Sequence, residues 1–362
     1  MSKADEIPAI SYIAEPLLVA SLLTIGCLVN RRKSSQLRVV QRAAATPARP
    51  ERLSFFKWPI TIPDTSMYEG RLISRFLARF PFLMEVWYWL LTYWVYQLAR
   101  AMQAVTMGAG TWEISKAHGE FLVWLEKSLW LDIELPLQAF VLARPNLLWF
   151  FNKTYAMVHI PATISFMAYS YYAFPTPIFQ RVRRTLVLCN CLAFVIFTLW
   201  PCMPPRLLPF EQYGFVDTLH TGKAASIWTT NKFQNQLAAF PSLHFGYSWV
   251  IGVALHVYSP NRAVKLIAPL YPLLILLVIM GTANHYFLDA VGGFFVTILA
   301  YKINTVLLNL RPFEEWGFWI CGVEKPMDGE VFQRVLSEQS GYKWEEERGL
   351  LEMTPSPEIG SV

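Results

Sequence analysis

Charged residues are scarce in this sequence. Asp, Glu, Lys and Arg make up 16% of its 362 residues, whereas soluble globular domains average about 25%. Hydrophobic residues reach 54%, aromatic residues 15%, and the mean hydropathy is +0.32. This composition argues against two ordinary soluble domains and favours one polytopic membrane domain with tryptophan and tyrosine at both membrane interfaces.

Cysteine is also sparse, and its spacing shows no metal or disulfide pattern. The chain has five cysteines: Cys27, Cys189, Cys191, Cys202 and Cys321. Without a zinc-type spacing or a disulfide framework, we expect neither a metal nor another cofactor. The net charge of +5 is spread along the chain rather than gathered in one patch. Membrane lipids and the bilayer are therefore the expected partners, and nucleic acid is not.

The first apolar run lacks the charge order of a cleavable signal peptide. Residues 12–29 are apolar, but the basic residues Arg31, Arg32 and Lys33 follow this run instead of preceding it. A signal peptide has its positive charges first and a small-residue cleavage site last. We therefore interpret residues 12–29 as an uncleaved transmembrane helix.

Six further apolar runs have roughly the length of membrane-crossing helices. They are residues 83–105, 147–173, 185–200, 241–258, 264–282 and 286–308. These runs are long and lack two-residue alternation, which indicates helices rather than strands. The sequence predicts an all-α polytopic membrane helical bundle, with a six-helix core and one N-terminal transmembrane helix. The expected domains are a helix with a basic cytosolic connector (1–82), a membrane-embedded domain (83–310) and a polar cytosolic tail (311–362).

Residues 117–143 are apolar but carry several charged side chains: Glu120, Glu126, Lys127, Asp132 and Glu134. These are too many charges for a lipid-exposed span, so we expect an amphipathic helix on the membrane surface or a re-entrant segment. Its acidic side chains are expected to form a solvated face. Glu134 is the one that could approach a substrate.

The topology brings a few polar residues to one interface. Most lysines and arginines fall in segments that alternate runs place on one side of the membrane, and the positive-inside rule makes that side cytosolic. The segment with Arg206 and the starts of the runs at 241–258 and 286–308 then lie on the opposite, lumenal or exoplasmic, side. His244 and His285 are thereby expected to face one another.

The residues at this interface suit phosphoryl transfer. His285 and Asp289 are four residues apart, which predicts one helix face with Cβ atoms about 6 Å apart. The aspartate can fix the imidazole tautomer, so that His285 attacks phosphorus and forms a phosphohistidine. His244 can act as general acid and base. Arg206 can bind phosphate oxygens, and Ser242 with the N–H groups of a helix start can complete an anion site.

Each of these residues also has an ordinary structural interpretation. A single histidine at a membrane interface is usually just solvated, and Arg206 alone could anchor a lipid headgroup. Asn152, Tyr155 and His159 form either a packing network or part of the site. The His–Asp spacing beside a PSLH segment on the same side of the membrane favours a functional site, because ionisable groups near spans are costly.

Four segments resemble a known family: TLWPCMPPRLLP (198–209), GFVDTL (214–219), FPSLHFGYSW (240–249) and TANHYFLDAVGG (282–293). They resemble the motifs of the type 2 phosphatidic acid phosphatase superfamily, and are most similar to its inositol phosphorylceramide synthase-like branch. The resemblance implies a six-helix membrane core in which His285 is the nucleophile, Asp289 orients it and His244 is the acid and base. The residues expected to bind the substrate are Arg206, Ser242, Asn284, Tyr155 and His159.

The chain also departs from the pattern of the phosphatases in this superfamily. The lysine expected seven residues before the first-motif arginine is Leu199, and the arginine expected six residues before the nucleophile is Ile279. Leu207 and Leu243 replace an expected proline and glycine. Two phosphate-binding cations are therefore absent, phosphate binding rests on Arg206, and the phosphotransferase branch is favoured.

Together these features predict an integral membrane lipid phosphotransferase that acts through phosphohistidine and is similar to inositol phosphorylceramide synthases. An endomembrane location, Golgi or endoplasmic reticulum, with a lumenal or exoplasmic site is expected, and the oligomeric state stays open. One alternative is a lipid phosphate or diphosphate phosphatase of the same superfamily. A second is a non-catalytic membrane protein or transporter on the same scaffold.

Overall fold

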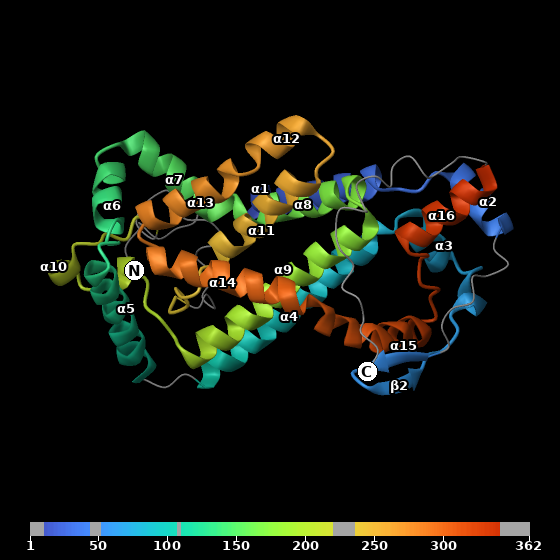
Figure 1. The fold of residues 1–362 in the computed structure, drawn as a ribbon, viewed down its shortest axis with the longest axis horizontal. Coiled ribbons are helices and arrows are strands. Elements are labelled where there is room, and N and C mark those ends of the chain that lie inside the picture. Colours follow the sequence, from blue (N-terminus) through green and yellow to red (C-terminus); the bar gives the residue numbers. More distant parts are fainter. Residues whose placement is uncertain (1–10, 44–51, 107–109, 220–235, 341–362) are drawn as a thin grey trace. The chain divides into compact units, whose positions relative to one another are not determined.

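The computed structural model describes residues 11–43, 52–106, 110–219 and 236–340. The chain divides into two compact units, of which the first combines Met1–Asn30 with Phe82–Asn309. The second combines Arg31–Pro81 with Leu310–Val362. The described residues are mostly helical, and they contain a single two-stranded hairpin (Figure 1). The predicted all-α membrane bundle is confirmed.

The first unit contains the long helices and the site. Its helices are α1 (Ser11–Val29), α4 (Phe82–Thr106), α5 (Gly110–Ser128), α6 (Glu134–Leu142), α7 (Pro145–Met157), α8 (His159–Ala173), α9 (Thr176–Leu199), α10 (Phe210–Tyr213), α11 (Leu243–Tyr258), α12 (Arg262–Ile267), α13 (Leu270–Gly281) and α14 (Phe287–Ile303). Short 3₁₀ turns lie at Pro205–Leu207 and Asn304–Leu310.

Four helices in the described part of the chain are long and apolar enough to cross a membrane: Tyr12–Val29, Thr176–Leu199, Arg262–Gly281 and Phe287–Cys321. They cover four of the seven predicted runs. Among the others, the run at 241–258 forms the 16-residue helix α11, which is shorter than a typical span. The run at 147–173 divides into α7 and α8, because Pro161 has no N–H to donate to the carbonyl of Met157.

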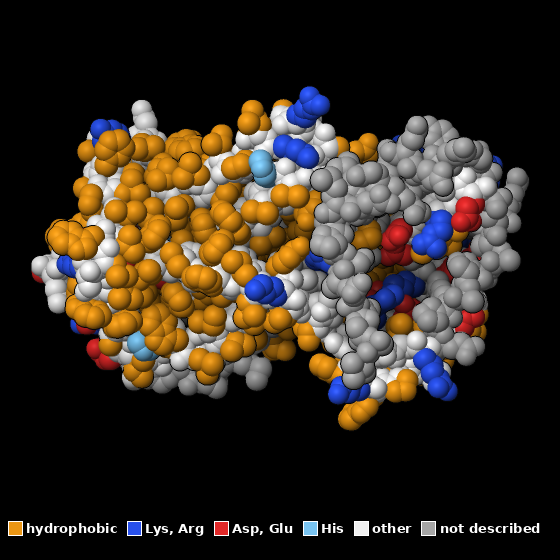
Figure 2. All heavy atoms as spheres, viewed as in Figure 1, with side chains coloured by type: hydrophobic (Ala, Val, Ile, Leu, Met, Phe, Trp, Pro, Cys, Tyr) orange, Lys and Arg blue, Asp and Glu red, His pale blue; other side chains and the backbone are white. Residues whose placement is uncertain are grey.

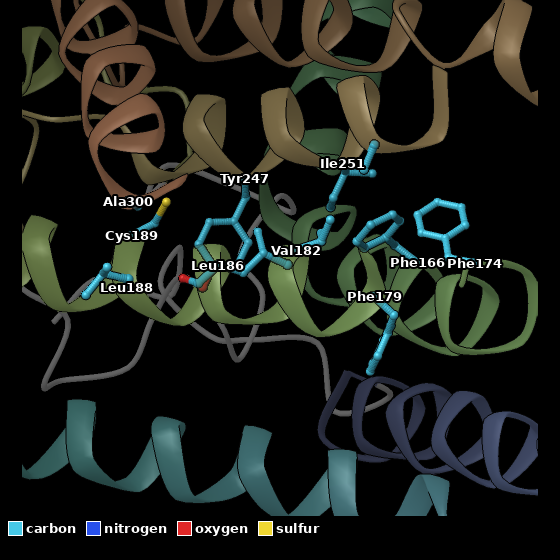
Figure 3. Packing of buried hydrophobic residues seen from close by; sticks show 11 residues of the cluster. Phe166, Phe174, Phe179, Val182, Leu186, Leu188, Cys189, Tyr247, Ile251 and Ala300 are labelled. Carbon is cyan, nitrogen blue, oxygen red and sulfur yellow. The ribbon is translucent and has the colours of Figure 1, made fainter. Parts of the chain in front are cut away.

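A hydrophobic core holds α8, α9 and α11 together (Figure 3). Phe166 of α8, Leu186 of α9 and Ile251 of α11 are all buried in it. Tyr247 of α11 lies among them and donates its hydroxyl hydrogen to the Leu186 carbonyl at 3.0 Å, while Asn190 Nδ2 donates to its oxygen at 2.6 Å. This core fixes the direction of α11, whose first turn carries His244.

The outer surface of the first unit is apolar where it is seen in Figure 2, and hydrophobic side chains cover it over α13 and α14 almost without a break. Large exposed hydrophobic residues on these helices include Leu270, Leu273, Phe295 and Leu299. Contiguous apolar surface of this kind marks a face that contacts lipid or another protein. It agrees with the membrane-spanning lengths of Arg262–Gly281 and Phe287–Cys321, the segments that contain these helices.

The second unit consists of α2 (Ser34–Ala43), β1 (Arg52–Phe55), β2 (Trp58–Thr61), a 3₁₀ turn (Ser66–Tyr68), α3 (Leu72–Arg79), α15 (Arg311–Cys321) and α16 (Gly329–Ser340). The two strands pair antiparallel around a turn in which Phe56 has a positive φ of 53°. The turn contains no glycine or asparagine, the residues that usually signal a hairpin, so the sequence did not predict it. Phe55 packs on Phe313, with ring centroids 5.1 Å apart, and Trp316 donates to the Thr61 carbonyl at 3.2 Å.

Candidate active site

The candidate site lies where α11 and α14 begin. The Ser242 N–H, just before α11, donates to the Asp289 carbonyl in the first turn of α14 at 2.9 Å. Gly293 permits this close approach, because a Cβ there would lie 2.4 Å from the Ser242 carbonyl oxygen. The two helix starts are thereby held side by side, and the His244 and His285 ring centroids are 5.6 Å apart.

His285 is oriented by two acceptors at one ring nitrogen. Its Nδ1 lies 3.2 Å from Asp289 Oδ2 and 2.9 Å from the carbonyl oxygen of Ala239. A carbonyl oxygen can only accept, so the hydrogen must be on Nδ1, and the lone pair of a neutral ring is then on Nε2. Both side chains are buried, Asp289 completely. In this arrangement Nε2 is the ring nitrogen that has the lone pair a nucleophile requires.

The contact between His285 and Asp289 forms in a different way from the one predicted. α14 begins at Phe287, so His285 precedes the helix and the two residues do not share a helix face. Asp289 instead folds back over the helix start, where the same Oδ2 accepts the Tyr286 N–H at 2.9 Å. The Asp289 side chain therefore caps α14 and orients His285 at once.

His244 is held by ring contacts. Its ring lies 4.6 Å from the Tyr155 ring in a stacked arrangement and 4.9 Å from the His159 ring. Among the described residues neither ring nitrogen of His244 has a hydrogen-bond partner. His159 Nδ1 is buried without a partner there as well. Tyr155 and His159, predicted to bind substrate, thus contact the His244 ring.

Arg206 is nearly buried and its guanidinium is held on two sides. Nε donates to Asn284 Oδ1 and Nη1 donates to Asp217 Oδ2, both at 2.9 Å. The Arg206 N–H also donates to the Ala283 carbonyl at 2.9 Å. Asn284, predicted to bind substrate, is used here to position Arg206, and its own Nδ2 donates to Thr282 Oγ1 at 2.8 Å.

Asp217 is a site residue that sequence reasoning missed. Gln138 exchanges two hydrogen bonds with the Val216 backbone, at 2.7 and 3.1 Å. Asn152 Nδ2 donates to the Thr218 carbonyl at 3.0 Å, and Thr218 Oγ1 donates to Asn152 Oδ1 at 2.9 Å. These clamps fix the residues on either side of Asp217, whose carboxylate binds Arg206. The only sequence feature that pointed to Asp217 was that it is the single acidic residue in the GFVDTL segment.

Ser242 is the N-cap of α11. Its Oγ accepts the Phe245 N–H at 3.3 Å, and the side chain is fully buried. This is the ordinary capping role of serine. The hydroxyl hydrogen is a further donor, which is the part of Ser242 that the predicted anion site would use.

Two acids expected on a solvated face are buried instead. Glu126 of α5 is 1% exposed and Glu134 of α6 is 2% exposed. Glu126 Oε1 accepts the Leu288 N–H at 2.8 Å, and Glu134 Oε1 accepts the Phe287 N–H at 2.6 Å. The prediction is wrong for these two residues because the free N–H groups of α14 provide them with donors inside the protein. In Figure 1, α5 and α6 lie at the end of the first unit where α14 begins.

Within the described ranges, no set of three or more His, Cys, Asp or Glu side chains has the arrangement of a metal site. The site offers an oriented imidazole, a second imidazole that can exchange protons, and a fixed guanidinium. These are the parts of a phosphoryl-transfer centre that works through a histidine.

An all-α membrane protein with this set of side chains is suited to phosphoryl transfer. A family model described as the PAP2 superfamily matches residues 120–303, which is just over half of the chain. The protein therefore belongs to the PAP2 superfamily, and is a phosphatase- or phosphotransferase-type lipid enzyme of a membrane. The match contains His244, His285, Asp289 and Arg206. No curated protein and no solved structure matches the chain.

Proposed function

We propose that this protein is a lipid phosphotransferase that moves a headgroup phosphate through a phosphohistidine on His285. The orientation of His285 carries the proposal. Two acceptors, the Asp289 carboxylate and the Ala239 carbonyl, hold Nδ1–H, so Nε2 is the nucleophilic nitrogen. His244 lies close enough, with ring centroids 5.6 Å apart, to serve the oxygens that leave and enter at the same phosphorus.

The reaction proceeds in two displacements. His285 Nε2 attacks phosphorus, the bond from phosphorus to the lipid oxygen breaks, and protonated His244 gives that oxygen its proton. The phosphohistidine now carries the headgroup, and His244 is neutral. His244 then takes the proton of an acceptor hydroxyl, the acceptor oxygen attacks phosphorus, and the bond to Nε2 breaks. Protons and electron pairs balance, and both histidines return to their starting states.

The charge of the described residues around the site supports a singly charged phosphodiester as donor. Arg206 is already paired with Asp217. Position 279, where the phosphatases have an arginine, is a fully buried isoleucine, and Leu199 replaces the expected lysine. A doubly charged phosphomonoester or a diphosphate would need more positive charge than these residues supply.

The resemblance to inositol phosphorylceramide synthases then suggests the substrates. The donor would be a phosphatidylinositol-type lipid and the acceptor a ceramide-type lipid alcohol, with the site on the lumenal face of an endomembrane. If water is the acceptor, the same residues make a lipid phosphatase. If His285 has no chemical role, the protein is a non-catalytic member of the superfamily or a transporter.

An assay in detergent micelles separates these possibilities. The purified protein is given labelled phosphatidylinositol with and without ceramide, and in parallel labelled phosphatidic acid and a lipid diphosphate. We expect transfer to ceramide by wild type and loss of transfer in His285→Ala. His256→Ala is the matched control, because His256 is an exposed histidine near the other end of α11. Equal turnover by wild type and His285→Ala would end the proposal, and release of free phosphate would show the phosphatase.

A further inference from the structure

Two buried acids from other helices bind the first turn of α14. Glu126 and Glu134 lie 162 and 153 residues before the N–H groups that they accept, those of Leu288 and Phe287. These N–H groups are among those that a helix start leaves without an intrahelical partner. The contacts join α5 and α6 to the helix that carries Asp289.

The same helix start sets the geometry of the nucleophile. His285 is two residues before Phe287, and Asp289 lies in the first turn. The Asp289 carboxylate accepts both the Tyr286 N–H and the His285 ring hydrogen. A shift or fraying of this turn would therefore move His285 and Asp289 relative to each other.

Both glutamates are harder to ionise than free carboxyl groups. Burial, followed by the charge of Glu134, raises the pKa of Glu126 to about 9, and burial also raises the pKa of Glu134. Both carboxyl groups lie at the start of α14, the positive end of the helix dipole.

A helix cap alone would not require this arrangement. A local Ser, Thr or Asp can satisfy the N–H groups of a helix start, whereas burying carboxyl groups costs several kcal/mol unless they are well paired. Glu126 and Glu134 each form such a pair with a backbone N–H of the helix. Their contacts reach the helix at the residues next to His285.

We propose that Glu126 and Glu134 are positioning residues, which hold the first turn of α14 so that Asp289 and the His285 nucleophile stay aligned. The inference rests on the proposed role of His285. It adds that α5 and α6, through one acid each, control the geometry of the reacting histidine without touching the substrate.

Full-length variants in detergent test the positioning role by comparing a conservative substitution with substitutions that remove the hydrogen-bond acceptors. Glu126→Gln keeps an oxygen for Leu288 and an N–H for Glu134, so its kcat should stay within about twofold of wild type. Glu126→Leu and Glu134→Leu remove the acceptors and should lower kcat on the order of 100-fold, the size of effect expected from a small misplacement of reacting groups. KM for the donor lipid should change little. Glu120→Gln, an acid near the middle of α5 that is partly exposed and near Lys116, is the control.

Hydrogen exchange gives a second readout that does not depend on turnover. The amides of Phe287 and Leu288 should exchange at least tenfold faster in the two leucine variants than in wild type, and Glu126→Gln should restore slow exchange. Unchanged exchange and turnover in the leucine variants would overturn the inference. Loss of activity in Glu126→Gln equal to that in Glu126→Leu would also overturn it. An inactive wild type whose exchange follows the predicted pattern would instead refute the proposed function and keep the positioning role.

A pH profile separates positioning from a simple loss of stability. The titratable groups around Glu126 are Glu134 of α6, Asp289 and Tyr286 at the α14 start, and Cys202. Wild-type kcat should fall as the pH approaches about 9, where Glu126 loses its proton, and Glu126→Gln should lack this fall. An alkaline limb that is the same in both proteins would contradict a role for the Glu126 proton in holding the first turn of α14.

Discussion

The two histidines of the site are held in opposite ways. His285 has its Nδ1 between a carboxylate and a carbonyl oxygen, and the helix start beside it is bound by three acids. His244 has ring neighbours and, among the described residues, no hydrogen-bond partner. A nucleophile benefits from one fixed direction, whereas an acid and base must serve a leaving oxygen and then an entering one. The different surroundings of the two histidines support the roles that we propose for them.

Replacing either histidine should have the largest effect on turnover. His285→Ala should abolish turnover of every donor, because no other side chain described at the site is oriented as a nucleophile. His244→Ala should lower turnover by roughly 10²- to 10⁴-fold with a lipid donor, the usual worth of general acid–base catalysis. With a donor whose leaving group is a nitrophenolate, the first step needs no proton, so phosphoenzyme formation by His244→Ala should recover towards wild type. Failure to recover would show that His244 has another role.

The two acceptors of His285 can be tested against each other. Asp289→Asn removes the carboxylate but leaves the Ala239 carbonyl, which still requires the hydrogen on Nδ1. We expect kcat to fall on the order of 100-fold, less than the roughly 10⁴-fold loss seen where a catalytic aspartate alone fixes the tautomer. Steady-state kinetics at saturating donor measure this. A loss as large as that of His285→Ala would mean that the carbonyl does not hold the tautomer.

A smaller effect is expected at Asp217, where a substitution tests how the site selects donors by their charge. Asp217→Asn removes the negative charge beside Arg206, so a doubly charged phosphomonoester should gain relative to a phosphodiester. We expect the ratio of their kcat/KM values to rise several-fold. Glu211→Gln, an exposed acid of α10 in the same loop, should leave the ratio unchanged. If this ratio is the same in Asp217→Asn as in wild type, Asp217 has no role in selecting the donor.

The smallest effect concerns stability rather than rate. The pKa of Glu126 is raised by burial and by Glu134 from an ordinary value near 4.5 to about 9. The folded protein then binds a proton that the unfolded chain has already released, so this contribution to stability is present at low pH and is lost as the pH rises towards about 9. Glu126→Gln cannot ionise. Its melting temperature should therefore improve relative to wild type as the pH rises from about 4.5 to about 9, and a constant difference over this range would contradict the shift.

The parts of the site that the sequence predicted have local signals. The apolar runs predicted the helical class, and the short polar segments beside them predicted His244, His285, Asp289 and Arg206. The helix boundary was harder, since nothing local shows that α14 begins after His285 rather than before it. The Phe56 turn was missed because it, too, lacks a local sequence signal.

The remaining parts depend on contacts between distant segments. The Ala239 carbonyl is a backbone group, and every residue has one. Glu126 and Glu134 look like a solvated face until the free N–H groups of α14 are placed beside them. Asp217 gains its role from Gln138 and Asn152, which hold the backbone on either side of it. Such pairings follow from tertiary structure and leave no periodic pattern.

The most direct measurement of the central claim is the phosphoenzyme itself. Wild type is mixed with donor lipid labelled in its phosphate, quenched in alkali after milliseconds, and digested for mass spectrometry. We expect a labelled, acid-labile phosphate with its headgroup on His285. This label should be absent from His285→Ala and present at a similar level in the His256→Ala control. Label on another residue, or turnover by wild type with no labelled protein at any time point, would contradict it.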